Sequence, residues 1–364
     1  MAKKKPNYKF RRNLAKAFLV FIIIIPIILI NRVKLAHLPL YLSNTKYTDV
    51  IDAMFEVKYT GSEAKSTLNY LKEKKKINDN TDDYILKLYD KGYSKNTIDY
   101  LIRNLNKSQI TDFLDKKYSK DFEEYIKLDL FKYSKYNRYI KYQEKHKDLS
   151  LEDVVIRIEL NMDKTYYEDS EFIKNPNEIT TLANKYYEIP EDYEPKDLVD
   201  MEDDYANNMY GTLTLRKEAY EKFKEMCNAS RKDGVKFYAE SAYRGYNYQN
   251  IIYKNYIDEN GQEKADKYAA RPGFSEHELG LALDLANIWT ITTKGEEYKW
   301  LTKNAYKYGY IIRYKKEWED ITGYSAESWH IRYVGVKAAS VIQKENITYE
   351  EYYAKYILTK KSSK

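Results

Sequence analysis

The sequence predicts an α+β protein with two parts: a helical domain over 46–187 and a mixed domain with a small antiparallel sheet over 188–345. Up to about residue 185, apolar residues recur at helical spacing, whereas after residue 215 short segments of two-residue alternation separate amphipathic helices. Because strands and helices do not alternate regularly, a doubly wound parallel sheet is not indicated. A chain of 364 residues has room for two cores.

The composition is that of a folded, well-solvated chain. Tyrosine supplies 41 residues, and charged residues make up 32%. Cys227 is the only cysteine, which excludes an internal disulfide and a cysteine-rich zinc site. A chain that avoids cysteine is compatible with an oxidising exterior.

The N-terminus has the pattern of a signal peptide or a signal anchor. Residues 1–16 carry seven Lys/Arg and no acid, and the 14 residues over 17–30 are uncharged and apolar. This run is shorter than the roughly 20 residues of a typical span, but apolar residues continue beyond it and no small-residue cleavage pattern follows. We therefore expect an uncleaved transmembrane anchor over 17–35 rather than a removed leader. The positive-inside rule places 1–16 in the cytoplasm and the chain beyond about Leu40 outside.

The charge balance argues against nucleic acid as a partner. Residues 1–34 hold nine Lys/Arg and no acid, so removing them from the formal net charge of +6 leaves −3 for the rest. The exported part therefore lacks a basic nucleic-acid footprint.

The helical domain is predicted from caps and apolar stripes. Its clearest helices lie over 81–92, 94–105 and 150–160. The first has a possible N-cap at Thr81 and stops at Gly92. The third begins after Ser150, although its Val154–Ile158 run is also compatible with a strand. The tripeptide YSK occurs three times at unequal spacing, so we interpret its serine as a helix cap rather than as the mark of a solenoid repeat.

The second domain follows a proline- and acid-containing linker over 188–199. We expect helices over 215–234, 246–257 and 296–309, and strands over 235–241, 281–286, 310–314 and 329–335. Tyr310 and Arg313 are interpreted as residues of a core strand. Residues 346–364 are interpreted as a C-terminal tail.

The four histidines allow one metal-site hypothesis. His37 lies at the membrane exit and His146 in a solvated loop, which leaves His277 and His330. Asp284 is an acid in an otherwise apolar strand, which is costly unless a metal or an arginine pairs with it. A catalytic zinc takes three protein ligands and keeps a fourth position open.

Glu327 precedes His330 by three residues and can reach the same site only under one condition. Strict strand alternation would place the two side chains on opposite faces, so we expect Glu327 at a loop-to-strand junction. The histidines are not in an HExxH arrangement, so a thermolysin-like helix is not indicated. Trp329 is interpreted as a packed wall beneath the metal site.

Three motifs together resemble the VanY-type D-alanyl-D-alanine carboxypeptidases, a group of zinc peptidases related to the VanX dipeptidases and the hedgehog-like fold. S-x-H-x-x-G-x-A-x-D spans Ser275–Asp284, E-x-W-H spans Glu327–His330, and S-x-Y-R spans Ser241–Arg244. The resemblance covers about 188–345, with every motif in order. One departure lies outside the ligands: Gly245 stands where many relatives have serine.

The resemblance implies a hydrolytic zinc centre. His277, Asp284 and His330 would bind Zn²⁺, and Glu327 would be the general base. Arg244 would polarise the scissile carbonyl and stabilise the oxyanion, the alternative being a surface salt bridge. Gln249 and Ser275 are candidates for holding the free carboxylate of the substrate.

The function implied is a membrane-anchored zinc carboxypeptidase that removes the terminal D-alanine from peptidoglycan stem peptides or their precursors, without a serine nucleophile. We expect it at the bacterial cell membrane as a single-pass protein with its catalytic domain extracytoplasmic. An L,D-carboxypeptidase, a D,D-dipeptidase and an endopeptidase remain open alternatives for the same site. A non-catalytic cell-wall binding or sensing protein, with 46–187 as its partner surface, is the alternative of another class. The presence of Glu327 favours an enzyme.

Overall fold

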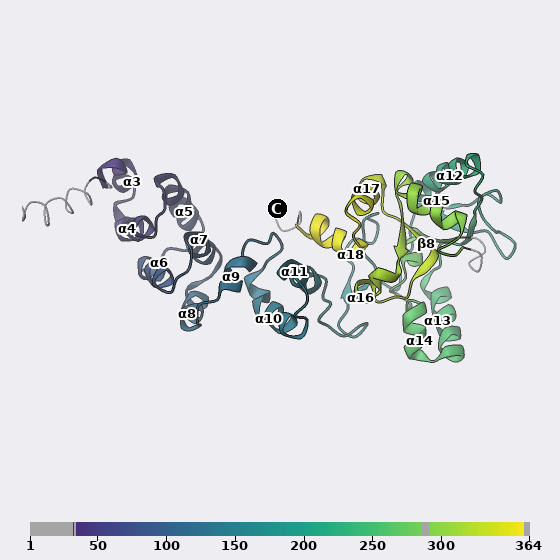
Figure 1. Ribbon diagram of the computed structural model, residues 1–364, viewed down its shortest axis with the longest axis horizontal. Coiled ribbons are helices and arrows are strands. Elements are labelled where there is room, and N and C mark those ends of the chain that lie inside the picture. The colour runs from purple at the N-terminus through teal and green to yellow at the C-terminus, as the bar shows by residue number, and fades with distance from the viewer. Residues whose placement is uncertain (1–31, 33, 286–290, 360–364) are drawn as a thin grey trace, which may run out of the picture. The chain divides into compact units, whose positions relative to one another are not determined.

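The chain divides into an N-terminal unit, 1–128, and a C-terminal unit, 129–364, and each is described by itself. This computed structural model describes residues 32, 34–285 and 291–359 (Figure 1). The predicted anchor over 17–35 lies almost entirely outside the described residues. Within the described part of the chain, no helix is both long and apolar enough to cross a bilayer.

The N-terminal unit is helical throughout its regular elements (Figure 1). Its α-helices are α3 (Leu38–Leu42), α4 (Thr48–Glu56), α5 (Gly61–Glu73), α6 (Thr81–Asp90), α7 (Lys95–Asn104), α8 (Lys107–Asp115) and α9 (Lys120–Tyr125). The longer helices bury an apolar stripe; in α7, for example, Ile98, Leu101 and Ile102 are buried while the opposite face is polar.

Local capping explains where several of these helices begin. The Thr60 hydroxyl accepts from the Glu63 amide and the Glu63 carboxylate accepts from the Thr60 amide, which completes a capping box. Ser94 and Ser119 cap α7 and α9, as the YSK pattern predicted. The third YSK serine, Ser134, lies inside the 3-10 turn Tyr133–Lys135 instead.

One predicted cap is wrong. Helix α6 has Asn80 at its N-cap, and Thr81 is its first helical residue. The Thr81 hydroxyl accepts a hydrogen bond from the amide of Asn78, so it stabilises the turn before the helix rather than the helix terminus.

The boundary between the two parts lies earlier than the predicted 187/188. Helices α10 (Tyr136–Lys145) and α11 (Leu151–Glu159) belong to the C-terminal unit. The Arg157 guanidinium donates to Asp320, 2.6 Å away and more than 160 residues later, and these long-range contacts attach α11 to the later domain. Segment 151–159 is helical and capped by Ser150, which decides between the helix and strand interpretations.

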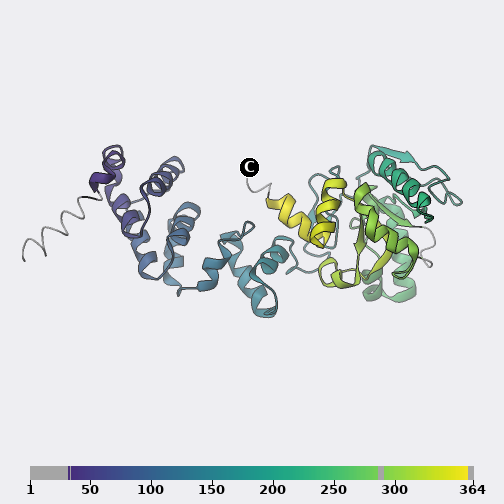
Figure 2. The ribbon, with the colours of Figure 1, turned by 45° about the horizontal axis from the view of Figure 1, so that its top comes forward.

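The centre of the C-terminal unit is a four-stranded antiparallel sheet with the order β5-β6-β8-β7 (Figures 1 and 2). Its strands are β5 (Ala239–Ser241), β6 (Ala282–Leu285), β7 (Tyr310–Tyr314) and β8 (Glu327–Tyr333). Two small two-stranded pairings are β1 (Glu171–Phe172) with β2 (Tyr187–Glu188), and β3 (Leu198–Asp200) with β4 (Thr214–Arg216). Helices and small sheets together give the predicted α+β class.

The remaining α-helices surround this sheet. They are α12 (Lys217–Lys232), α13 (Tyr246–Asn260), α14 (Gln262–Tyr268), α15 (Glu296–Asn304), α16 (Glu319–Thr322), α17 (Val336–Glu345) and α18 (Tyr349–Tyr352). Segment 235–241 is a strand only at its last three residues, shorter than predicted. Helix α15 gives way to the 3-10 turn Ala305–Tyr308, which ends at Gly309 with a φ of 82°.

The two faces of the sheet differ in chemistry. Leu283 of β6 and Ile331 of β8 belong to the core cluster together with Phe223 of α12. Their strand neighbours, Asp284 and His330, therefore project to the opposite face because side chains alternate along a strand. The sheet thus has one face for the core and one face for polar chemistry.

The predicted C-terminal tail is wrong for its described part. Residues 349–352 form α18, and a π-helical segment Tyr353–Leu358 follows. Tyr349 and Glu350 are each 1% exposed. The reason is a buried ion pair: Arg313 of β7 donates to both oxygens of the Glu350 carboxylate, at 3.0 and 2.5 Å.

Candidate active site

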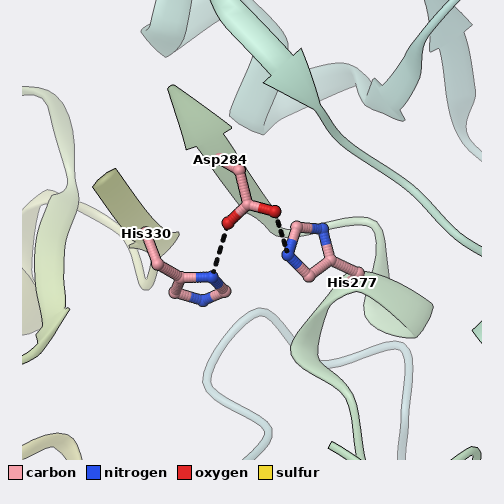
Figure 3. A group of neighbouring side chains, drawn as sticks. All are labelled: His277, Asp284 and His330. Atoms are coloured by element: carbon pink, nitrogen blue, oxygen red, sulfur yellow. Dashed lines mark hydrogen bonds and ion pairs between the residues drawn. The ribbon is translucent and has the colours of Figure 1, made fainter. Parts of the chain in front are cut away.

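Asp284 and His330 face each other across the middle of the sheet. They are register partners in the β6–β8 pairing, and His330 Nδ1 lies 3.0 Å from Asp284 Oδ1. His277 Nε2 lies 3.3 Å from the other carboxylate oxygen, Oδ2. Figure 3 shows the two imidazoles on either side of the Asp284 carboxylate.

His277 is brought to this point by a short turn. The 3-10 helix Glu276–Leu279 begins with a capping box in which Ser275 and Glu278 exchange hydrogen bonds with each other's backbone amides. It ends at Gly280, whose φ of 63° is left-handed, and the chain then enters β6. This turn lets His277 and Asp284, seven residues apart, face the same point, as the sequence indicated.

The histidines present different ring nitrogens to Asp284. His277 Nδ1 lies 2.6 Å from the carbonyl oxygen of Ala242 and donates to it, which leaves Nε2 as the acceptor atom towards Asp284. Burial, followed by the positive charge of Arg244, lowers the pKa of His277 to about 4. A neutral imidazole with a fixed tautomer is the form that binds a metal.

His330 and Asp284 form a charge-coupled pair in this structure. Burial lowers the pKa of His330, but hydrogen bonds to Asp284 and Glu276 outweigh that effect and raise it to about 9. Burial opposes ionisation of Asp284, yet the neighbouring His277 and His330 hold its pKa well below the usual range. The carboxylate therefore stays ionised, as a metal ligand must be.

Glu327 reaches the same side of the sheet as His330 through a bulge. Ile312 pairs with Ile331 and Tyr314 pairs with Glu327, so one residue of β7 lies opposite three residues of β8 between these pairs. Glu327 Oε2 consequently lies 3.8 Å from His330 Nδ1. The expectation of a junction at the strand start is confirmed. Burial raises the pKa of Glu327 to about 7, so this carboxylate can accept and release a proton near neutrality.

Arg244 also projects into the site rather than into solvent. Its NH1 donates to Ser241 Oγ at 2.6 Å and lies 3.2 Å from Asp284 Oδ2. The alternative of a surface salt bridge for Arg244 is therefore wrong. Asp284 does have an arginine partner, Arg244, in addition to the two histidines.

Gln249 and Ser275, the predicted carboxylate-binding residues, are occupied by structural contacts. Gln249 accepts from Arg244 Nε at 3.0 Å and donates to the Ala270 carbonyl at 2.8 Å. The Ser275 hydroxyl caps the turn that carries His277. Both line the cavity, and their binding of a substrate carboxylate stays a prediction.

These residues surround a cavity of about 410 Å³. Its other walls are mostly aromatic or apolar and include Ile252, Tyr256, Tyr268, Tyr314, Tyr324 and Trp329. Trp329 also packs against the core, as predicted, and Tyr310 is fully buried in it. The cavity size lies in the range of small-ligand sites.

A buried ionic layer beneath His330 was missed from the sequence. Glu276 Oε2 lies 3.3 Å from His330 Nε2, and Glu276 Oε1 lies 2.8 Å from Arg313 Nε. Arg332 NH1 lies 3.1 Å from the same Oε1 atom. Strand alternation could have indicated part of this layer. Arg332 follows His330 by two residues, so both side chains lie on one face of β8.

The donor set fits a catalytic zinc site. Among the residues that the structure describes, one donor atom from each of His277, Asp284 and His330 lies within 4.8 Å of the other two. Two imidazole nitrogens and one carboxylate oxygen are suitable zinc ligands, and a catalytic site leaves a further position for water or substrate.

Comparison with known proteins gives consistent matches. The family model described as VanY: D-alanyl-D-alanine carboxypeptidase matches residues 212–336. Putative carboxypeptidase YodJ of Bacillus subtilis strain 168 is 42% identical over 211 residues, which are 54% of this chain and 77% of that protein.

Two solved structures are also similar. The LdcB LD-carboxypeptidase is 42% identical with a TM-score of 0.48, over 52% of this chain and 92% of that one. A mutant D,D-pentapeptidase VanY from a VanB-type resistance cassette, in complex with Zn(II), is 31% identical with a TM-score of 0.42, over 48% of this chain and 97% of that one.

Proposed function

The chain belongs to the VanY family of D-alanyl-D-alanine carboxypeptidases, and we propose that it is a zinc-dependent enzyme that removes the terminal D-alanine from peptidoglycan stem peptides. One observation carries the proposal: Glu327, whose pKa burial raises to about 7, lies beside the converging donors of His277, Asp284 and His330. A site that only binds a wall peptide needs the donors or the cavity but has no use for this base.

The residues divide the work of peptide hydrolysis between them. A zinc ion held by His277, Asp284 and His330 would polarise the scissile carbonyl and lower the pKa of a water molecule to about 7. Glu327 accepts the proton of the attacking water on a carboxylate oxygen and returns it to the nitrogen of the departing D-alanine. Because its pKa lies near neutrality, both transfers are accessible at the same pH.

Arg244 supplies positive charge where the carbonyl oxygen becomes negative. Its guanidinium is held by Ser241 and Gln249, so it is preorganised before substrate arrives. Its fixed position also explains why a lysine would not replace it, since a guanidinium can keep these contacts and still present a free edge.

We further propose that the catalytic unit works outside the cell, at the bacterial membrane. The basic residues 1–16 and the apolar run 17–30 support this location. Peptidoglycan stem peptides are then on the same side as the cavity.

The test is mass spectrometry of purified stem peptides after incubation with the full-length chain and zinc. A pentapeptide ending in D-Ala-D-Ala should lose one alanine, chelator should abolish the loss, and added zinc should restore it. Parallel reactions with a tetrapeptide and with free D-Ala-D-Ala identify L,D-carboxypeptidase or dipeptidase activity. Zinc binding without cleavage of any of these peptides contradicts the proposal.

A further inference from the structure

We infer that Glu276 is a positioning residue that fixes the tautomer of His330, and that residues beyond the peptidase motifs, on α18, complete its support. The inference rests on the zinc site proposed above. It concerns the face of His330 that points away from that site, into a layer of buried charge.

The two nitrogens of His330 have separate environments. Nδ1 faces the open side, 3.0 Å from Asp284 Oδ1 and 3.8 Å from Glu327 Oε2. Nε2 faces the interior, 3.3 Å from Glu276 Oε2. Both nitrogens face a carboxylate here, but only the Nδ1 side also faces Asp284, His277 and the cavity. Once a metal takes the Nδ1 lone pair, Glu276, whose carboxylate has only acceptor atoms, would hold the remaining proton on Nε2.

Glu276 is itself held rigidly. Its side chain is 1% exposed, and its second oxygen is 2.8 Å from Arg313 Nε. Arg332 approaches that same oxygen at 3.1 Å as an ion pair and is anchored by donation to the carbonyls of Tyr333 and Thr181. The carboxylate can therefore neither rotate away from His330 nor reach solvent.

The support continues to the C-terminal segment. Arg313 donates with its remaining nitrogens to Glu350 of α18, at 3.0 and 2.5 Å. With two arginines and two carboxylates, the layer is neutral, which allows it to stay buried. Removing Glu350 would leave Arg313 with an uncompensated charge and free it to shift towards Glu276.

His277 offers a useful contrast within the same site. Its remote nitrogen donates to a backbone carbonyl, Ala242 O, at 2.6 Å. That contact is built into the fold, whereas the contact of His330 depends on a side chain that can be changed. The tautomer of His277 is therefore fixed by the backbone, whereas that of His330 is fixed by a carboxylate.

The direct test is nitrogen NMR of the zinc-loaded full-length chain with labelled histidine. Of the four histidines, single His37→Gln and His146→Gln variants identify the two outside the site, and through-bond correlations to the backbone distinguish His277 from His330. We expect His330 to carry a slowly exchanging proton on Nε2 and to bind zinc through Nδ1. Zinc on Nε2 of His330 overturns the inference, and this measurement needs no variant of the buried layer.

The second test measures zinc affinity by competition with a chromogenic chelator. We expect Glu276→Gln to weaken zinc binding 10- to 100-fold, and Glu350→Gln to weaken it less. The matched control is Glu159→Gln. The Glu159 carboxylate is also 1% exposed and is paired with two lysines, and it makes no contact with the proposed zinc ligands. It should keep the affinity within about twofold of the parent, since it contacts no ligand.

The outcomes separate this inference from the proposed function. A parent chain that binds no zinc contradicts the proposed function. A parent chain that binds zinc and cleaves peptide, with unchanged affinity in a folded Glu276→Gln variant, contradicts only the role of Glu276. If that variant does not fold, the NMR result for the parent chain decides.

Discussion

The two units of this chain obtain order in different ways. In the N-terminal unit, local contacts such as the Thr60–Glu63 capping box combine with contacts between helices near one another in the chain, such as the ion pair of Glu63 with Lys95. In the C-terminal unit, the decisive contacts join distant residues, as when Asp284 meets His330 across two strands. Catalytic groups must be brought together from several elements. A sheet with a polar face brings them together, whereas a series of short helices can be stable without such convergence.

The treatment of charge differs in the same way. Lys87 and Asp83 are about half exposed, so their pairing contributes little. Arg313, Glu276 and Glu350 are at most 1% exposed, so each depends on its partners for solvation. Buried charged residues therefore lie next to the site, and through Glu350 they connect it to α18.

The largest expected effect is the loss of the base. Glu327→Gln should lower the turnover number by 10²- to 10⁴-fold, because the amide cannot accept the proton of the attacking water. Zinc binding should persist. The control in the other unit is Glu63→Gln, which should leave turnover unchanged. Steady-state peptide cleavage and zinc titration measure both effects, and loss of zinc from Glu327→Gln would mean that Glu327 is a ligand.

The next effect compares two equally buried leucines. Leu283→Ala in β6 and Leu101→Ala in α7 should each lower the free energy of unfolding by about 2–5 kcal/mol, because each leaves a cavity. Only Leu283→Ala should also weaken zinc binding, since it adjoins Asp284. All four tryptophans lie in the C-terminal unit, so their fluorescence follows its urea unfolding while circular dichroism follows both units. Equal zinc affinities of the two leucine variants would contradict the proposed difference between the two units.

A third prediction concerns alkaline pH. Burial holds the pKa values of Tyr310, Tyr314 and Tyr324 well above 10, whereas an unfolded tyrosine ionises near 10. Above pH 10 the folded state therefore binds more protons, and stability falls by roughly 1.4 kcal/mol per pH unit for each such tyrosine. Urea unfolding followed by tryptophan fluorescence should show a steep loss between pH 10 and 11.

Lys185 should act in the opposite direction at lower pH. Burial lowers its pKa from 10.5 to about 8, so between these values the unfolded chain binds more protons and stability rises with pH. The raised pKa values of His330 and Cys227 act in the opposite direction over parts of this range, so the effect of Lys185 is measured as a difference. Relative to Lys185→Met, the parent C-terminal unit should gain stability from pH 8 to about 10; parallel pH profiles for parent and variant would contradict this role of Lys185.

The smallest effect compares two capping boxes. Thr60→Ala at α5 and Thr348→Ala at α18 should each cost about 1 kcal/mol of unfolding free energy. Only the second loosens the helix that carries Glu350, so only it should shift the imidazole resonances of His330. Matching resonances in both variants would show that α18 is not coupled to the site.

The motifs were sufficient to pick out the residues that the fold brings together, His277, Asp284 and His330, because those residues are defined by local spacing. His277 and Asp284 are joined by one turn, and Glu327 and His330 by one bulge, so the residue types at these intervals indicate a metal site before any folding is known. The strand alternation also placed Leu283 and Leu285 opposite Asp284 correctly. The class and helices α11, α12, α13 and α15 of the C-terminal unit followed from the same periodicities.

The tertiary structure alone decided which distant groups support that site. Periodicity reports the face of a single element, and it carries no information on what packs against that face. It could not show that Gln249 holds Arg244, that Glu276 lies under His330, or that Glu350 belongs to the buried layer. These contacts exist because a buried charge must find its partner wherever packing places one, and packing depends on the whole fold.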